Sequence, residues 1–393
     1  MKQSRLQTCR RISLALVAAL AACCHRPVDW QALDEQTLEQ NLAALQTAEE
    51  AYLSRLSTGD ISAAAREAQA RLQGLTGVDT VIIAPDSTVW AYFANGLVAG
   101  VCEQTFGTGT STPQPPLRGT WTASAAPEGG VVGSSPEILV PFAEELPGTV
   151  HEAEAVLRMC RNCYVLRKAK VHQNNEVTVT RVKALLQDAR SLLFWTGHGC
   201  LVSPYPGAPP GAALLTGKGY SRRELAAAVA GDFRADAQAG QSGPRLAFVA
   251  HNRRFYPVIL PAFVRAYGRF ENSEPYWKTI VYVSACFSAY VTNPELEQAF
   301  RDAGADLYCG FDWAVNDMFS CELDTAFIGA MADTCLPLEA LAQLGAVTDP
   351  DPIFGRNASF RISGDTLAML RHVLDARRDG RLHRAGAVVA TSG

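Results

Sequence analysis

The chain contains 393 residues, of which 48% are hydrophobic and 19% are charged, and its formal net charge at pH 7 is -4. This composition excludes a largely disordered chain, which would combine low hydrophobicity with high net charge, and favours two or three folded domains. The 39 Asp and Glu residues outnumber the 35 Lys and Arg residues, so no basic surplus can neutralise phosphates and we expect no nucleic-acid partner.

The amino-terminal segment predicts an export signal. Basic residues without any acid open the chain, at Lys2, Arg5, Arg10 and Arg11. The apolar run that follows, Ile12–Cys24, is shorter than the ~20 residues that span a bilayer. Leu20–Cys23 resembles the bacterial lipoprotein signal, so we predict a signal over residues 1–23, lipidation of Cys23, and an exported protein lipid-anchored to a bacterial cell membrane, at its periplasmic face or the cell surface. A plain secretory signal cut near Ala22, or a short uncleaved anchor, is the alternative.

Residues 24–105 form the first predicted folded region. Apolar spacing predicts helices over Trp30–Leu75, interrupted at Gly59-Asp60. Residues 78–101 are rich in β-branched and aromatic residues and contain two hairpin turn signals, at 85–87 and 95–96. A Gly/Ser/Pro-rich linker over 106–136 follows, and we expect the domain boundary there.

Residues 137–363 alternate between apolar strands and helices, which is typical of an α/β fold with a mainly parallel sheet sandwiched by helices. The expected strands are Glu137–Phe142, Ser191–Thr196, Arg245–Val249, Thr279–Ser284 and Asp306–Phe311. The expected helices are Thr149–Cys160, Thr178–Ala189, Ser221–Ala230, Leu260–Tyr267 and Pro294–Ala303. A C-terminal helix and tail are expected over 364–393.

Two of these strands end at a reactive side chain between small residues. Leu192–Thr196 leads into His198, which has a glycine on each side, and Ile280–Ser284 leads into Cys286. Since ligands of open α/β sheets bind beyond the carboxyl ends of the strands, we expect the two side chains to meet at a common edge.

A cysteine and a histidine in this arrangement suit nucleophilic catalysis. A thiol is only partly ionised at neutral pH, and a nearby imidazole makes it a better nucleophile. Cys286 would attack a scissile carbonyl, His198 would protonate the leaving amine, and the amides of Gly199 and Cys286 would form the oxyanion hole. Taken singly, Cys286 also fits a buried core thiol and His198 a turn histidine.

The two blocks, 192–199 and 280–288, resemble the caspase-like cysteine peptidases, the group that includes caspases, gingipains, clostripain, separase and the CHAT domains. A third block, Phe300–Asp317, is similar to the CHAT and separase segment in which a helix ending in Ala-Gly-Ala leads into a strand closed by Trp and an acid. Asn175–Lys183 also fits the bacterial members, and the resemblance spans about residues 137–351. It implies a caspase-like (CHAT-like) peptidase domain, a cysteine endopeptidase with a thioester on Cys286, a protein or peptide substrate and no required cofactor.

The resemblance also implies a specificity. Some members cleave after basic residues and hold the side chain with an acid, for which Asp317 and Asp312 are the candidate substrate-binding residues. Both also fit turn or capping positions. Separase carries a further acid directly after the Trp, where this chain has Ala314, which counts against basic specificity.

Two other functions remain open. The domain could be a catalytically inactive relative that binds peptides or proteins, or the region Trp30–Val101 could be the working part of a surface scaffold. Self-cleavage in the linker at its lone basic residue, Arg118, is a further hypothesis.

The remaining Cys and His residues carry weaker signals. Cys160 and Cys163 fit a core or disulfide role, and export would allow disulfides among Cys102, Cys309, Cys321 and Cys335. His251 fits a polar loop or a third, orienting catalytic residue. The other histidines have no ligand-like partners at short spacing, so no metal site is expected: His151, His172, His372 and His383.

Overall fold

A computed structural model describes residues 34–57, 59–102, 136–163, 170–187, 192–238, 243–270, 278–332, 337–344 and 347–366. The predicted signal with Cys23, nearly all of the predicted linker with Arg118, and the predicted C-terminal helix lie outside the described residues. Within these ranges, no helix combines the length and the apolar character that crossing a bilayer requires.

A six-stranded sheet lies between two layers of helices, in the strand order β13-β12-β11-β6-β4-β5. All neighbouring strands run parallel except β13, which is antiparallel to β12. The strands are β4 (Glu137–Val140), β5 (Lys170–Gln173), β6 (Leu192–Thr196), β11 (Ile280–Ser284), β12 (Leu307–Phe311) and β13 (Phe360–Gly364). Every residue of β6, β11 and β12 is buried, as their continuous apolar runs predict for strands covered on both faces.

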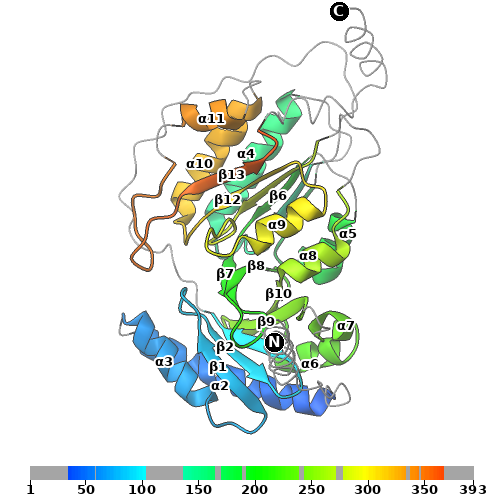
Figure 1. Ribbon diagram of the computed structural model, residues 1–393, viewed down its shortest axis with the longest axis vertical. Helices are drawn as coiled ribbons and strands as arrows, with labels where there is room; N and C mark the ends of the chain where they lie inside the picture. The colour runs from blue at the N-terminus through cyan, green and yellow to red at the C-terminus, as the bar shows by residue number, and fades with distance from the viewer. Residues whose placement is uncertain are drawn as a thin grey trace, which may run out of the picture.

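The helices divide between the two faces of this sheet. Figure 1 shows α4 (Pro147–Cys163) and α10 (Asp317–Ala332) together on one side, with α8 (Pro261–Tyr267) and α9 (Glu295–Asp302) on the other. Two more helices join them, α11 (Pro337–Gln343) against α10 and α5 (Val179–Leu186) against α8. The chain leaves β4 toward β5 but passes from β6 to β11 in the opposite direction, so right-handed crossovers require helices on opposite faces.

A second sheet of seven strands has the order β1-β2-β3-β9-β10-β8-β7. Its strands are β1 (Val78–Ile83), β2 (Val89–Phe93), β3 (Val98–Val101), β7 (Gly199–Val202), β8 (Gly211–Leu215), β9 (Leu246–His251) and β10 (Arg254–Ile259). The antiparallel meander of β1, β2 and β3 confirms both predicted hairpin turns.

The second sheet corrects two expectations. Strand β3 pairs in parallel with β9, so the boundary expected at 106–136 does not separate two sheets. Strand β9 was expected in the same mainly parallel sheet as the His and Cys strands, but it forms a hairpin with β10 in the other sheet. The cause is a two-residue turn at Asn252 and Arg253, which adopt the left-handed φ values 50° and 60°.

Helices α2 (Glu35–Leu56), α3 (Ile61–Leu72), α6 (Arg222–Ala230) and α7 (Arg234–Ala237) cover the second sheet. The break predicted at Gly59-Asp60 is confirmed, because the Asp60 side chain caps α3 by accepting from Ala63 N. Ser221 and Glu224 form a capping box at the start of α6. These local signals are strong enough that the helix starts were predictable.

The amino-terminal hairpin holds the strand that follows His198. The Trp90 indole N–H donates to Leu201 O (2.8 Å), and the Tyr92 hydroxyl donates to Ser203 O (2.8 Å). Leu201 N donates to the Asp86 carboxylate (2.7 Å), and burial raises the pKa of Asp86 to about 6. Three side chains of residues 86–92 therefore hydrogen-bond to the backbone of Leu201 and Ser203, at the end of β7 and just after it.

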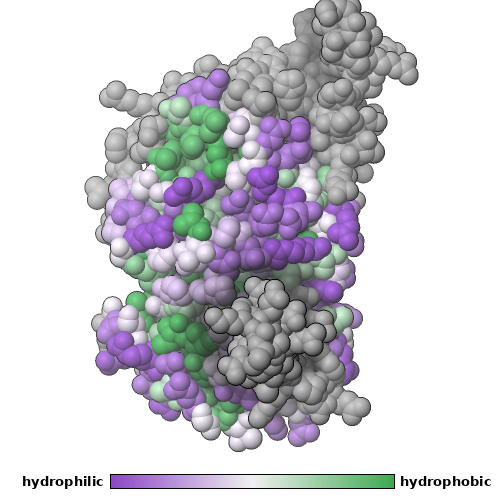
Figure 2. Space-filling model, in the orientation of Figure 1, coloured by the Kyte–Doolittle hydropathy of each residue, from purple (hydrophilic) through white to green (hydrophobic). Residues whose placement is uncertain are grey.

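The surface is mixed in character. Figure 2 shows hydrophobic residues gathered over α10 and α11, where Met318 and Leu338 are slightly more than half exposed. The five cysteines with described side chains, Cys102, Cys200, Cys286, Cys309 and Cys321, are free thiols.

Candidate active site

Four neighbouring parallel strands end at one edge of the six-stranded sheet, and each is followed by a polar side chain. In the spatial order β12, β11, β6 and β4, these side chains are Asp317, Cys286, His198 and Glu145. The carboxyl ends of parallel strands share an edge, and the connections after β4 and β6 diverge, which opens a crevice between them. The sequence-based expectation that His198 and Cys286 reach the same edge is thereby met.

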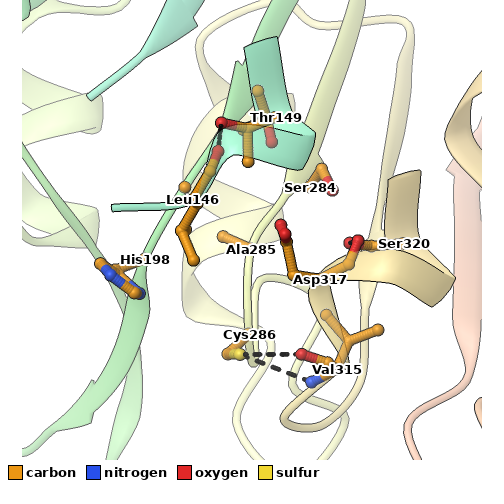
Figure 3. A pocket seen from close by; sticks show the side chains of 11 residues that line it. Leu146, Thr149, His198, Ser284, Ala285, Cys286, Val315, Asp317 and Ser320 are labelled. Carbon is orange, nitrogen blue, oxygen red and sulfur yellow. Dashed lines mark hydrogen bonds between the residues drawn. The ribbon is translucent and has the colours of Figure 1, made fainter. Parts of the chain in front are cut away.

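A small pocket of about 30 Å³, open to solvent on one side, lies at this edge. Its lining includes Thr196, His198, Ser284, Cys286, Val315 and Asp317 (Figure 3). The predicted histidine, the predicted thiol and one of the two predicted acids therefore line a single cavity.

Gly199 brings the His198 segment and the Cys286 segment into direct contact. A Cβ atom at Gly199 would lie 2.2 Å from the carbonyl oxygen of Cys286, a separation that no side chain can occupy. Glycine is therefore required next to His198, because the two backbones approach each other closely. The oxyanion hole expected from the amides of Gly199 and Cys286 stays a prediction.

The Cys286 thiol hydrogen-bonds to the backbone of Val315. It donates to Val315 O (3.8 Å) and accepts from Val315 N (3.4 Å), and Figure 3 shows the sulfur directed at these atoms. Burial raises the pKa of the Cys286 thiol to about 11, so the thiol is protonated at neutral pH. Phe287, the next residue, has a left-handed φ of 62°, a costly conformation of the kind found at functional sites.

His198 hydrogen-bonds to Glu145 rather than to Cys286. His198 Nε2 lies 3.2 Å from Glu145 Oε1, and the Phe142 ring packs edge-on against the imidazole. Burial lowers the pKa of His198, although the Glu145 carboxylate opposes this shift. In a neutral imidazole whose Nε2 donates to a carboxylate, Nδ1 keeps the lone pair that can take a proton.

Glu145 is a site residue that the sequence did not reveal. Partial burial favours its neutral form, but hydrogen bonds from His198 and His251 outweigh this and hold the pKa of Glu145 well below its usual range. The only signal was its position shortly after β4, because Glu144-Glu145 reads as a pair of solvated charges.

His251 approaches the same carboxylate from the second sheet. Its Nε2 lies 2.8 Å and 3.0 Å from the two oxygens of Glu145, and its ring centroid is 5.4 Å from that of His198. Of the two roles considered for His251, a polar loop residue is excluded by its burial at the end of β9. It contacts Glu145, the residue that holds His198.

A buried acidic pair lies behind the pocket. Thr196 Oγ1 donates to Glu152 Oε2 (3.2 Å), and Tyr282 donates to Asp324. Burial and the neighbouring Asp324 carboxylate raise the pKa of Glu152 well above its usual value.

Asp317 points into the pocket, and burial raises its pKa (Figure 3). Among the described residues, no Lys or Arg forms an ion pair with its carboxylate. Its Oδ2 would lie 2.8 Å from a Cβ at Gly148, in the first turn of α4. The carboxylate therefore packs against the start of α4 while it lines the pocket.

Asp312 does not line the pocket, contrary to expectation. Its buried carboxylate accepts from Ser359 N (2.7 Å), Arg356 (3.2 Å) and Arg361 (3.0 Å). These partners belong to β13 and the segment before it, so Asp312 fastens the end of β12 to its antiparallel neighbour. The carboxylate of Asp312 thus has a structural role, because Ser359, Arg356 and Arg361 already bind it.

No known protein-family model and no curated protein matches this chain. The function proposed for this chain therefore rests on the geometry of the pocket.

Proposed function

We propose that this chain is a cysteine endopeptidase, with Cys286 as nucleophile and His198 as acid–base residue, that cleaves after Arg or Lys. The observation that carries the proposal is the delivery of Asp317, Cys286 and His198 to one pocket by three neighbouring strands, with Glu145, which follows the fourth strand, in contact with His198. A nucleophile, a base, a group that orients the base and a charged specificity group are the parts that such a reaction needs.

The reaction would begin with the neutral thiol. On substrate binding, Cys286 turns from Val315 toward the scissile carbonyl, and His198 Nδ1 takes the thiol proton as the C–S bond forms. The negative charge moves to the carbonyl oxygen, which the Gly199 and Cys286 amides would stabilise. The imidazolium then gives its proton to the leaving amine, and water hydrolyses the remaining thioester. Glu145 stabilises the imidazolium throughout.

The pocket suits a basic side chain. Asp317 supplies a carboxylate that pairs with no Lys or Arg among the described residues, and a guanidinium can bind a carboxylate through two parallel hydrogen bonds. The Thr196 hydroxyl donates a hydrogen bond to Glu152, so the lone pairs of its oxygen remain to accept from a ligand. A cation would also offset the burial of Asp317.

One observation favours a second candidate, a peptide-binding module without turnover. The Cys286 thiol is protonated and hydrogen-bonded to Val315, and His198 is engaged by Glu145, so the two groups are not paired in this state. A relative that binds basic peptides would use the same pocket and the same Asp317.

Covalent labelling separates the two candidates. A short peptide that ends in Arg and carries a thiol-reactive group should label the wild-type protein, and Cys286→Ala should abolish labelling. Cys321→Ser is the matched control, because Cys321 is also a partly exposed free thiol but bonds to Gly148 O instead of lining the pocket. Equal labelling of wild type and Cys286→Ala would reject the peptidase.

A further inference from the structure

Glu145, His198 and His251 each offer a ligand atom, and these three atoms lie within 4.8 Å of one another. We propose that this cluster is a binding site for a divalent cation, of which Zn²⁺ fits best. Two imidazoles and one carboxylate are a ligand set that Zn²⁺ takes when a fourth position stays open. The sequence predicted no metal site because the three residues come from distant segments and two different sheets.

The ligand atoms already stand near the required spacing. Zn–N and Zn–O bonds of about 2.0–2.2 Å in a tetrahedron place neighbouring ligand atoms about 3.3 Å apart. Glu145 Oε1 lies 3.2 Å from His198 Nε2 and 2.8 Å from His251 Nε2. All three ligand atoms lie within 4.8 Å of one another, so the two imidazole nitrogens need to move only slightly closer to complete the site.

Hydrogen bonds outside the cluster orient two of the ligands. His251 Nδ1 lies 3.1 Å from Cys102 O, and because a carbonyl only accepts, Nδ1 carries the proton and Nε2 faces the carboxylate. Metal-binding histidines characteristically donate their other N–H in this way. Asn252 Nδ2 donates to Glu145 Oε2 (3.3 Å), which turns the other oxygen toward both imidazoles.

The surroundings provide enclosure and access. The Phe142 ring packs edge-on against both imidazoles, with centroids 4.5 Å and 6.0 Å away. Glu145 lines a second, more open pocket of about 420 Å³, together with Asn252 and Tyr256. An ion can therefore enter without passing Cys286, and solvent can fill the fourth position.

Occupancy would switch off the proposed peptidase, a consequence that rests on the function proposed above. A metal can bind His198 Nε2 only when the proton that this nitrogen donates to Glu145 has moved to Nδ1, so the metal-bound imidazole carries its proton on Nδ1. Nδ1 is the atom that would have to accept the thiol proton, so the metal-bound histidine could not act as the base.

The test measures Zn²⁺ binding by calorimetry to the full chain carrying Cys286→Ala, after chelator treatment. This variant should bind one ion per chain, and Glu145→Gln or His251→Gln added to it should weaken binding by about tenfold or more. His172→Gln is the matched control, because His172 forms a similar buried pair with Glu137 (2.7 Å) elsewhere in the sheet. Co²⁺ should give an absorption spectrum without a thiolate charge-transfer band, in wild type and variant alike.

Each result decides the proposal. Unchanged Zn²⁺ binding in Glu145→Gln, or binding that is lost in Cys286→Ala alone, would overturn the site. Glu145→Gln keeps the test valid if His251→Gln does not fold, because the Glu145 side chain is partly exposed. Binding through these residues by a protein that shows no peptidase activity would reject the peptidase and keep the metal site.

Discussion

Ser284 and Thr196 are paired in register across β11 and β6, and Cys286 and His198 each lie two residues beyond that pair. Side chains on neighbouring parallel strands alternate together, so equal distances from a paired position bring the two reactive residues to the same level of the edge. The same pair forms part of the pocket lining. A shift of the β11–β6 register by one residue would therefore remove both the pocket and the dyad.

The raised pKa of Cys286 predicts the pH dependence of its reactivity. Only the thiolate reacts with small alkylating reagents, and burial places the pKa of Cys286 at about 11. The alkylation rate in the free protein should therefore climb steadily between about pH 7 and pH 10. A rate that levels off below pH 7 would instead show a preformed thiolate–imidazolium pair. The measurement uses iodoacetamide with a Cys321→Ser background.

Asp317→Asn should weaken the binding of substrates with Arg before the cut. Removing the charge while keeping the shape loses a charge-assisted pair, which corresponds to about a 10–100-fold rise in KM. Asp312→Asn is the control: it should lower the melting temperature, because Arg356 and Arg361 lose their partner, and leave KM for the same peptide unchanged. Equal KM values for the Asp317→Asn variant and wild type would remove Asp317 from the specificity pocket.

Glu145→Gln should lower kcat by about 100-fold with little change in KM, because Glu145 positions His198 and stabilises its charged form without touching substrate. The pH profile provides the readout that a structural role would not move. Without the neighbouring negative charge, the pKa of His198 falls further, so the acid limb of the kcat profile shifts to lower pH. A uniform loss of activity with an unmoved acid limb contradicts this role.

Gly199→Ala should abolish activity in a protein that still folds, since the added Cβ forces the Cys286 carbonyl away from its position. Gly211→Ala is the matched control, because the nearest neighbour of its Cβ would be the side chain of Asn293 at 3.2 Å and not a backbone atom. Peptide hydrolysis by both variants, alongside their circular dichroism spectra, provides the measurement. Full activity in Gly199→Ala would mean that the close contact between the two segments is unnecessary.

The parallel sheet and its helices were predictable because each of these elements is specified by a pattern within its own short stretch of sequence. Strands covered on both faces have continuous apolar sequences, as in Leu192–Thr196 and Ile280–Ser284. The starts of helices such as α6 can be predicted from their capping residues. The His198 and Cys286 segments could be found because a reactive side chain follows each such strand.

The second sheet could not be predicted in the same way. Arg253 adopts a left-handed φ that usually calls for glycine, so the β9–β10 turn carried no local signal. The β3–β9 pairing joins segments far apart in the chain, and no local pattern reports it. Glu145 and His251 could be recognised as site residues only from their contact in the folded chain, because they are far apart in the sequence.

The pairing of β3 with β9 holds together, within one sheet, the parts of the chain that come before and after residues 103–135. A nick anywhere in that stretch would produce two polypeptides that stay together, because the ladder from Ala99 to Val101 and the indole of Trp90 are anchored in the larger fragment. Such a two-chain molecule would migrate as one species under native conditions and dissociate only in denaturant.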